Sequence, residues 1–218
     1  MSPSPAPVVV LLSGRGSNLQ AIIDETTAGR LDIDVRAVIS NRAEAEGLQL
    51  ARAAGIPTHV IEPRDYADRD QFDAALMQAI DTHAPRLVIL AGFMRILGAD
   101  FIQHYAMRLI NIHPSLLPAF KGLNTHARVL DAKMEQHGAS VHFVTPDVDG
   151  GPIIIQSALT VQPNDTAQSL AQRVLVEEHR IYPLAIQWFI AGRLTLDKGR
   201  VLLDGQQRPQ QGLPMMSV

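Results

Sequence analysis

Apolar residues in the first half of the chain form short continuous runs, separated by longer stretches in which they recur at helical spacing. Continuous runs rich in Val, Ile and Leu are typical of strands covered on both faces. Three segments have helical spacing: one that follows Asn18, one over about 42–54 and one over about 69–83. Asp68 and Gln71 form a capping pair at the start of the third. The runs that predict strands are Val8–Leu12, Val35–Ile39, Leu87–Leu90 and Leu109–Ile112. This alternation indicates βαβ units, so we predict an α/β protein with an open, mainly parallel twisted sheet and helices on both faces.

The second half of the chain is less regular, because prolines and glycines mark two loops near 114–125 and 145–152. A capping box of Asp165 and Gln168 predicts the start of a long helix, and Pro183 predicts a kink in it. The elements expected in this half are strands at Ser140–Val144 and Ile153–Val161, the helix from Asp165 toward Trp188, and an edge hairpin of Leu194–Leu196 and Val201–Leu203.

The ends of the chain differ from its middle. Residues 1–7 are mostly Ser, Pro and Ala, which predicts a loose, disordered tail. No repeat, low-complexity tract or linker divides the remainder, so residues 8–218 are predicted to form a single domain.

Composition narrows the function classes. Among the 218 residues, 19 basic and 22 acidic side chains give a net charge of −3, which argues against nucleic-acid binding by bulk electrostatics. The absence of cysteine excludes a disulfide scaffold, a thiolate nucleophile and a cysteine-ligated metal. The apolar run Val8–Leu12 is too short for a signal core or a membrane span, so we expect a cytoplasmic protein without membrane contact.

The turn after the first predicted strand, Ser13–Asn18, contains two glycines and leads into a helix. Backbone N–H groups at such a place suit a phosphate, although an ordinary strand-to-helix turn explains the glycines equally well. The turn is not a dinucleotide fingerprint, because Leu19 stands where a third glycine is needed, and the chain has no Walker loop.

Polar side chains follow two further strands. Asn111 and His113 share one strand face at the carboxyl end of an apolar strand, where ligands bind in open α/β sheets. A histidine can protonate or polarise a carbonyl oxygen near neutral pH, and a neighbouring amide can donate to the same oxygen. Asp147 and Asp149 lie in the later loop, and an aspartate that met His113 would orient it. The alternatives are a capping pair and an Asp-rich turn, and the spacing does not decide between them.

Two charged residues break helical rules. Glu178 falls within an apolar stripe of the long helix, so either the stripe reaches a cleft there or the helix rotates past Pro183 and exposes it. Arg69 lies in the first turn of a helix, where the macrodipole disfavours a cation, and either a bound carboxylate or solvent would compensate. The eight histidines form neither His-x-His nor HExxH, so no metal site is expected.

At these residues the chain resembles a known family, the folate-dependent phosphoribosylglycinamide formyltransferases (glycinamide ribonucleotide transformylases). The segments that carry the resemblance are SGRGSNLQAII at 13–23, LAGFMRIL at 90–97, NIHPSLLPAFKG at 111–122, SVHFVTPDVDGGPII at 140–154 and EEHRIYP at 177–183. The resemblance implies a Rossmann-like formyltransferase fold over 8–218, with a phosphate-binding half at about 8–105 and a folate-binding and catalytic half at about 106–218. Arg15 and Lys121, which lie in two of the predicted loops, differ from the family pattern.

The resemblance also implies roles for particular residues. The implied catalytic residues are Asn111, His113 and Asp149. The phosphoribosyl substrate would be bound by Gly16, Ser17, Asn18 and Glu178. The folate would be bound by Arg69, Met94, Arg95, Ile96, Leu97, Asn111, Thr145, Pro146, Asp147, Val148 and Asp149.

The implied reaction is formyl transfer from 10-formyltetrahydrofolate, as co-substrate, to the amine of phosphoribosylglycinamide in purine biosynthesis, by a monomer or homodimer and without a metal. The alternatives on the same scaffold are a formyltetrahydrofolate hydrolase and a formyltransferase that acts on methionyl-tRNA or a sugar nucleotide. A non-catalytic folate or nucleotide sensor is a further alternative. A nicotinamide-dependent reductase is disfavoured by the failed glycine fingerprint.

Overall fold

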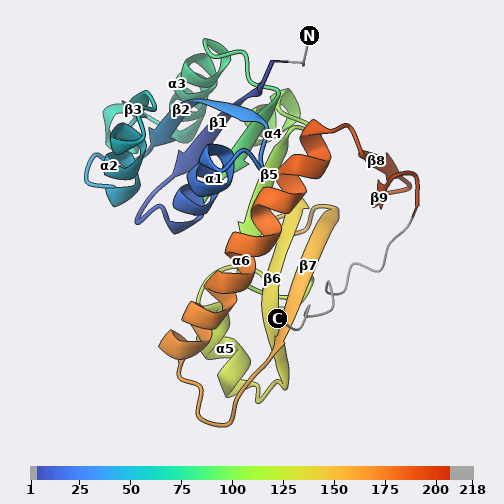
Figure 1. Cartoon of the computed structure of the whole chain (residues 1–218). Coiled ribbons are helices and arrows are strands. Elements are labelled where there is room, and N and C mark those ends of the chain that lie inside the picture. Colours follow the sequence, from blue (N-terminus) through green and yellow to red (C-terminus); the bar gives the residue numbers. More distant parts are fainter. Residues whose placement is uncertain (1–3, 207–218) are drawn as a thin grey trace. The chain divides into compact units, whose positions relative to one another are not determined.

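A computed structural model describes residues 4–206 and divides the chain into two compact units, Met1–Asn111 and Ile112–Val218 (Figure 1). The first unit alternates strands and helices, as the apolar pattern predicts. Its elements are β1 (Ala6–Leu12), α1 (Ser17–Thr27), β2 (Ile33–Ser40), α2 (Glu46–Ala53), β3 (Thr58–Val60), the 3-10 helix η1 (Pro63–Asp65), α3 (Arg69–Asp81), β4 (Leu87–Leu90), α4 (Ala99–His104) and β5 (Leu109–His113), whose last two residues belong to the second unit.

The strands of the first unit are parallel and follow the order β3-β2-β1-β4-β5. β1 is the central strand, and Val10 pairs with Val38 on one side and Ile89 on the other. Val8–Leu12 is completely buried, because neighbouring strands flank a central strand on both sides and helices cover both of its faces. α1 contacts α2 and α3 contacts α4, as expected when right-handed crossovers place the two pairs on opposite faces. The prediction of a mainly parallel α/β sheet is confirmed.

The strand order reverses between β1 and β4. The chain moves outward from β1 to β2 and β3, and then returns to place β4 on the other side of β1. Ligands of open α/β sheets bind at the carboxyl ends of the two strands that flank such a reversal. In this unit those ends lead into the Ser13–Asn18 turn and into the segment that begins at Ala91.

The second unit contains a two-stranded antiparallel pair with a long helix along it. Its elements are α5 (Thr125–Asp131), β6 (Gln136–Phe143), β7 (Ile153–Thr160), α6 (Ala167–Ile190), β8 (Leu194–Asp197) and β9 (Arg200–Leu203). α6 packs against both β6 and β7 (Figure 1). The stripe predicted from spacing forms its buried face, which includes Leu170, Val174, Ile181 and Ala185. β8 and β9 form the predicted hairpin.

Several expectations about element ends are wrong, among them those for β1 and α6; β6 also begins earlier than predicted, at Gln136 and not at Ser140. Ala6 and Pro7 belong to β1 and not to a loose tail, because the Ala6 N–H donates to Asp32 O and Pro7 O accepts from Arg86 N. α6 is capped by Thr166 and not by the predicted Asp165 and Gln168, since the Thr166 side chain accepts from Ser169 N and Ser169 Oγ accepts from Thr166 N. Residues 1–3 of the predicted tail and residues 207–218 of the predicted domain lie outside the described part. No helix in 4–206 is long and apolar enough to span a bilayer.

Candidate active site

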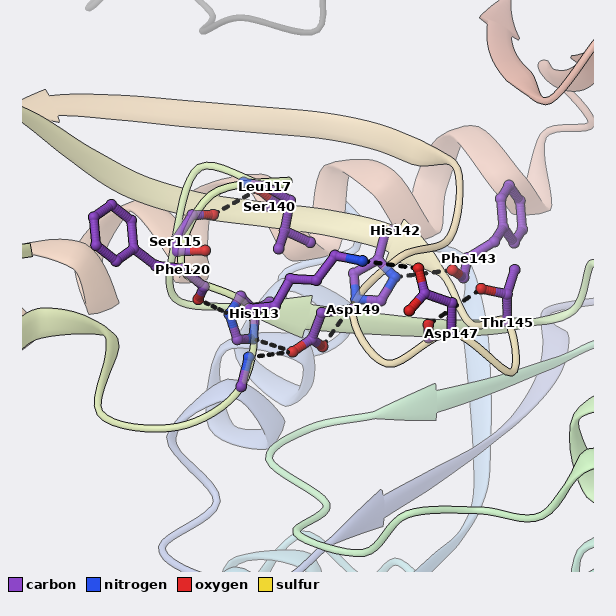
Figure 2. A network of polar contacts seen from close by, with 12 residues as sticks. His113, Ser115, Leu117, Phe120, Ser140, His142, Phe143, Thr145, Asp147 and Asp149 are labelled. Carbon is purple, nitrogen blue, oxygen red and sulfur yellow. Dashed lines mark hydrogen bonds and ion pairs between the residues drawn. The ribbon is translucent and has the colours of Figure 1, made fainter. Parts of the chain in front are cut away.

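His113 and Asp149 meet in the second unit. His113 is the last residue of β5, and its Nδ1 lies 3.3 Å from Asp149 Oδ2 (Figure 2). On the other side of the ring, Nε2 lies 3.0 Å from Phe120 O. Both ring nitrogens therefore face oxygen acceptors, an arrangement that suits an imidazolium, which donates from both nitrogens. Asn111 precedes His113 by two residues on β5 and so lies on the same side of the strand.

Asp149 accepts a hydrogen bond from a backbone amide and lies near a second histidine. Gly122 N donates to its Oδ2 at 2.9 Å, and His142 Nε2 lies 3.7 Å from its Oδ1. Asp149 has a φ of 49°, a left-handed conformation that Asp tolerates better than most residues.

His142 is a neighbour of the pair that the sequence reasoning missed. It lies on β6, it is buried, and its Nδ1 donates to Phe143 O at 2.8 Å (Figure 2). Burial lowers the pKa of His142, while the contact with Phe143 O and the charge of Asp149 oppose this shift. When His142 is neutral, it does not form an ion pair with Asp149, and His113 remains the histidine that the carboxylate can stabilise in its protonated form.

The loop after His113 is anchored on β6 and β7 by a buried polar network. Ser140 Oγ donates to Ser115 O at 2.6 Å and accepts from Leu117 N at 3.0 Å. Gln156 Nε2 lies within hydrogen-bond distance of both Leu117 O and Ser140 Oγ. The Leu117–Pro118 peptide bond is cis. This network fixes the path of the chain that carries the Phe120 carbonyl back to His113.

A second histidine pair in this unit predicts a pH-dependent stability. His137 is 1% exposed and its Nε2 lies 3.0 Å from His126 Nδ1. Burial, with the charges of His126 and His113, lowers the pKa of His137 to about 4. In the unfolded chain His137 has an ordinary pKa of about 6.5, so it takes up a proton more readily there than in the folded protein. The contribution of neutral His137 to the free energy of unfolding is therefore fully present above about pH 6.5 and is lost as the pH falls to about 4.

We expect this loss to reach the order of 2–3 kcal/mol. Denaturant unfolding between pH 7 and pH 4 measures it. The variant His137→Asn should show a shallower fall of stability over the same range, and an unchanged slope in that variant would contradict the assignment.

The turn after β1 has the geometry expected of an anion cradle. Gly16 has a φ of +80°, and a Cβ there would lie 2.6 Å from Gly47 Cα, so only glycine fits. α1 begins at Ser17, directly after Gly16, and the N–H groups of its first turn have no intrahelical acceptor. Asn18 is buried beside them. These amides and the helix dipole would favour a phosphate at this place.

The chain after β4 presents apolar side chains to solvent. Met94 and Ile96 are each 65% exposed, whereas Leu97 is buried. Met94 N donates to Ser13 Oγ at 2.7 Å, and the Arg95 guanidinium lies 5.6 Å from the centre of the Phe72 ring. Exposed apolar side chains on a fixed backbone are suited to contact a flat, mainly apolar ligand.

The predicted site residues are distributed over both units. The first unit contains Gly16, Ser17, Asn18, Arg69, Met94, Arg95, Ile96, Leu97 and Asn111, and the second contains His113, Thr145, Pro146, Asp147, Val148, Asp149 and Glu178. Glu178 is 8% exposed on α6, so the alternative in which the helix rotates it into solvent is wrong. Asp147 pairs with Lys121 Nζ at 2.8 Å. Among residues 4–206 no group of three or more His, Cys, Asp or Glu side chains could hold a metal ion.

Comparison with known proteins shows the family to which the chain belongs. The profile of the formyl transferase family matches residues 6–186, so the chain belongs to the formyl transferase family.

The particular relatives agree with one another. The chain is 51% identical to the phosphoribosylglycinamide formyltransferase of Escherichia coli (strain K12) over 94% of the chain and 97% of that protein. It is 45% identical to the Homo sapiens trifunctional purine biosynthetic protein adenosine-3 over 90% of the chain and 20% of that protein. The phosphoribosylglycinamide formyltransferase structure from Coxiella burnetii matches with a TM-score of 0.92 and 50% identity, over 96% of this chain and 100% of that one. The resemblance read from the sequence, and with it the prediction of a formyltransferase of purine biosynthesis, is confirmed.

Proposed function

We propose that this chain transfers the formyl group of 10-formyltetrahydrofolate to the primary amine of phosphoribosylglycinamide. The observation that supports this reaction most directly is the contact of 3.3 Å between His113 Nδ1 and Asp149 Oδ2 at the end of β5. A buried imidazolium with a carboxylate behind it is suited to stabilise negative charge on an oxygen atom.

The neutral amine attacks the formyl carbon, and the carbonyl oxygen becomes an oxyanion. His113 Nε2 exchanges its contact with Phe120 O, 3.0 Å in the structure, for a hydrogen bond that it donates to this oxyanion. Asn111, on the same side of β5, supplies a second donor from its side-chain amide. Asp149 keeps its charge next to Nδ1 and so stabilises the protonated ring.

The tetrahedral intermediate collapses when the bond between the formyl carbon and the folate nitrogen breaks. The proton that the attacking amine must lose passes to this folate nitrogen, directly or through a water. The products are the N-formyl compound and tetrahydrofolate, with no covalent enzyme intermediate. Two substrates held in line supply much of the remaining rate advantage.

Each substrate has its own set of residues in this proposal. The Gly16–Asn18 turn binds the phosphate, and Glu178 binds the ribose or glycinamide part of the same substrate. Arg69 contacts the acidic tail of the folate, while Met94–Leu97 and Thr145–Asp149 enclose its pterin. A single formyltransferase domain that includes β1 from Ala6 onward, a monomeric or homodimeric state and a cytoplasmic location complete the proposal.

The test is an assay of formyl-donor consumption with and without phosphoribosylglycinamide. Consumption that requires phosphoribosylglycinamide and yields one formylated product per donor consumed supports the proposal. Equal consumption in both reactions would identify a formyltetrahydrofolate hydrolase, and binding of both substrates without consumption would identify a sensor.

The variant Glu178→Gln should raise the KM for phosphoribosylglycinamide about tenfold or more, because a neutral amide accepts weaker hydrogen bonds from hydroxyl or amine groups. The KM for the formyl donor should change less than about twofold. Steady-state kinetics with each substrate varied in turn measures both values, and a selective change in the KM for the folate would show that Glu178 faces the other ligand.

A further inference from the structure

The Met94–Leu97 segment is fixed to the first unit by side-chain contacts on both sides. At its beginning, the buried Ser13 Oγ accepts from Met94 N at 2.7 Å and donates to Asn41 Oδ1 at 2.5 Å. Ser13 ends the apolar run of β1, and Met94 follows β4, so this contact joins the two strands that flank the reversal of strand order. Ser13 N also donates to Gly92 O at 3.1 Å.

At its other end the segment is fixed by Asp73 of α3. Asp73 Oδ2 accepts from Gly98 N at 2.6 Å, and Gly98 immediately follows Leu97 and caps α4. The contact is close, since a Cβ at Gly98 would lie 2.9 Å from Asp73 Oδ2 and would require the carboxylate to shift. Asp73 is therefore in direct contact with the backbone that ends the segment.

The surroundings of Asp73 are unusual for a carboxylate that only caps a helix. Its side chain is 4% exposed, and its Oδ1 is buried without a hydrogen-bond partner within residues 4–206. Burial raises the pKa of Asp73, while the Gly98 N–H and the charges of Arg69 and Arg95 oppose this shift, and the charge of Asp70 adds to it. Burying a carboxylate is costly, so a position that retains one needs a role that an apolar residue could not fill.

We propose that Asp73 is a positioning residue of the formyl-donor subsite, because its carboxylate holds Gly98 and so sets the path of Met94–Leu97. This inference rests on the proposed function, in which Met94–Leu97 encloses the pterin. Asp73 lies near two arginines that belong to the same subsite, Arg69 and Arg95. Asp73 touches neither substrate in this account, and its effect passes through the backbone that it holds.

The experiment compares Asp73→Ala, Asp73→Asn and the control Asp32→Asn, which removes one negative charge from an exposed residue of the same unit. Asp73→Ala should weaken tetrahydrofolate binding about tenfold, measured by titration calorimetry, and should raise the KM for 10-formyltetrahydrofolate to the same extent. The affinity for phosphoribosylglycinamide and kcat should change less than about twofold. Asp73→Asn retains an oxygen acceptor for Gly98 N and should recover most of the affinity, and Asp32→Asn should behave like the unmodified chain.

The outcomes separate this inference from the proposed function. Equal losses for both ligands in Asp73→Ala, or an unchanged folate affinity, would overturn the positioning role. An unmodified chain that binds no folate would overturn the proposed function itself. If Asp73→Ala does not fold, Ser13→Ala tests the same segment from its other end, and it should show the same selective loss of folate affinity.

Discussion

Replacing His113 with alanine should lower kcat about 10²–10³-fold, the usual cost of removing one oxyanion donor. The KM values should change less than about threefold, because Nε2 donates strongly only after charge has developed on the formyl oxygen. The reaction then depends on the remaining donor and on the alignment of the two substrates, which preserves a measurable rate. Steady-state kinetics with both substrates near saturation measures the effect.

His59→Ala is the matched control for this variant. His59 is an exposed histidine whose ring nitrogen lies 3.3 Å from that of His83, so its removal should leave kcat within about twofold. A His113→Ala chain with nearly normal kcat would remove His113 from the chemistry, whatever its contact with Asp149.

Replacing Asp149 with asparagine should lower kcat about 10²-fold. The amide has nearly the shape of the carboxylate and can still accept from Gly122 N, but it has no charge to stabilise a protonated ring 3.3 Å away. The loss should therefore appear in kcat and much less in the thermal midpoint. Parallel kinetics and thermal unfolding of the same preparation distinguish the two.

Asp131→Asn provides the control for charge alone, since Asp131 is an exposed carboxylate at the end of α5 in the same unit. It should leave kcat and the thermal midpoint unchanged. A thermal midpoint for Asp149→Asn lowered by many degrees, together with a normal kcat for the folded fraction, would make Asp149 a structural residue only.

The regular elements were predictable where the local pattern is strong. β4 begins and ends where its apolar run does, because all four of its residues are buried. The start of α3 was also correct, since Asp68 accepts from Gln71 N at 2.9 Å. β3, α4 and α5 were missed, because three to seven residues are too few to show a period.

The errors at helix starts have a common physical origin. Thr166 and Asp165 are both good capping residues, and the choice between them depends on contacts outside the helix. Asp165 Oδ2 lies 2.5 Å from Arg173 Nη1, so its carboxylate is engaged in an ion pair and Thr166 caps α6 instead. α2 begins at Glu46 and not near 42. Ser40 Oγ accepts a hydrogen bond from Arg42 N and donates one to Arg42 O, and these contacts keep Arg42 in a turn.

Candidate site residues could be chosen from the sequence, but the contacts between them could not be predicted. The position of His113 at the carboxyl end of an apolar strand indicated a ligand edge, whereas its contact with Asp149 depends on how a loop 36 residues later folds back. The contacts from Phe120 O and Gly122 N are made by backbone atoms, which every residue carries, so no residue type signals them. His142 could have been noticed as a polar residue inside an apolar strand, in SVHFV.

We expect His113 and Asp149 to act as one unit on the oxyanion of the formyl group. A double-mutant cycle tests it most directly, with single-turnover formyl transfer measured in the unmodified chain, His113→Ala, Asp149→Asn and the double variant. If the two residues act as a unit, the double variant should be no more than about threefold slower than His113→Ala, because Asp149 has no ring left to support. Rate losses that multiply across the two single variants would contradict the claim, since they would show that each residue acts independently.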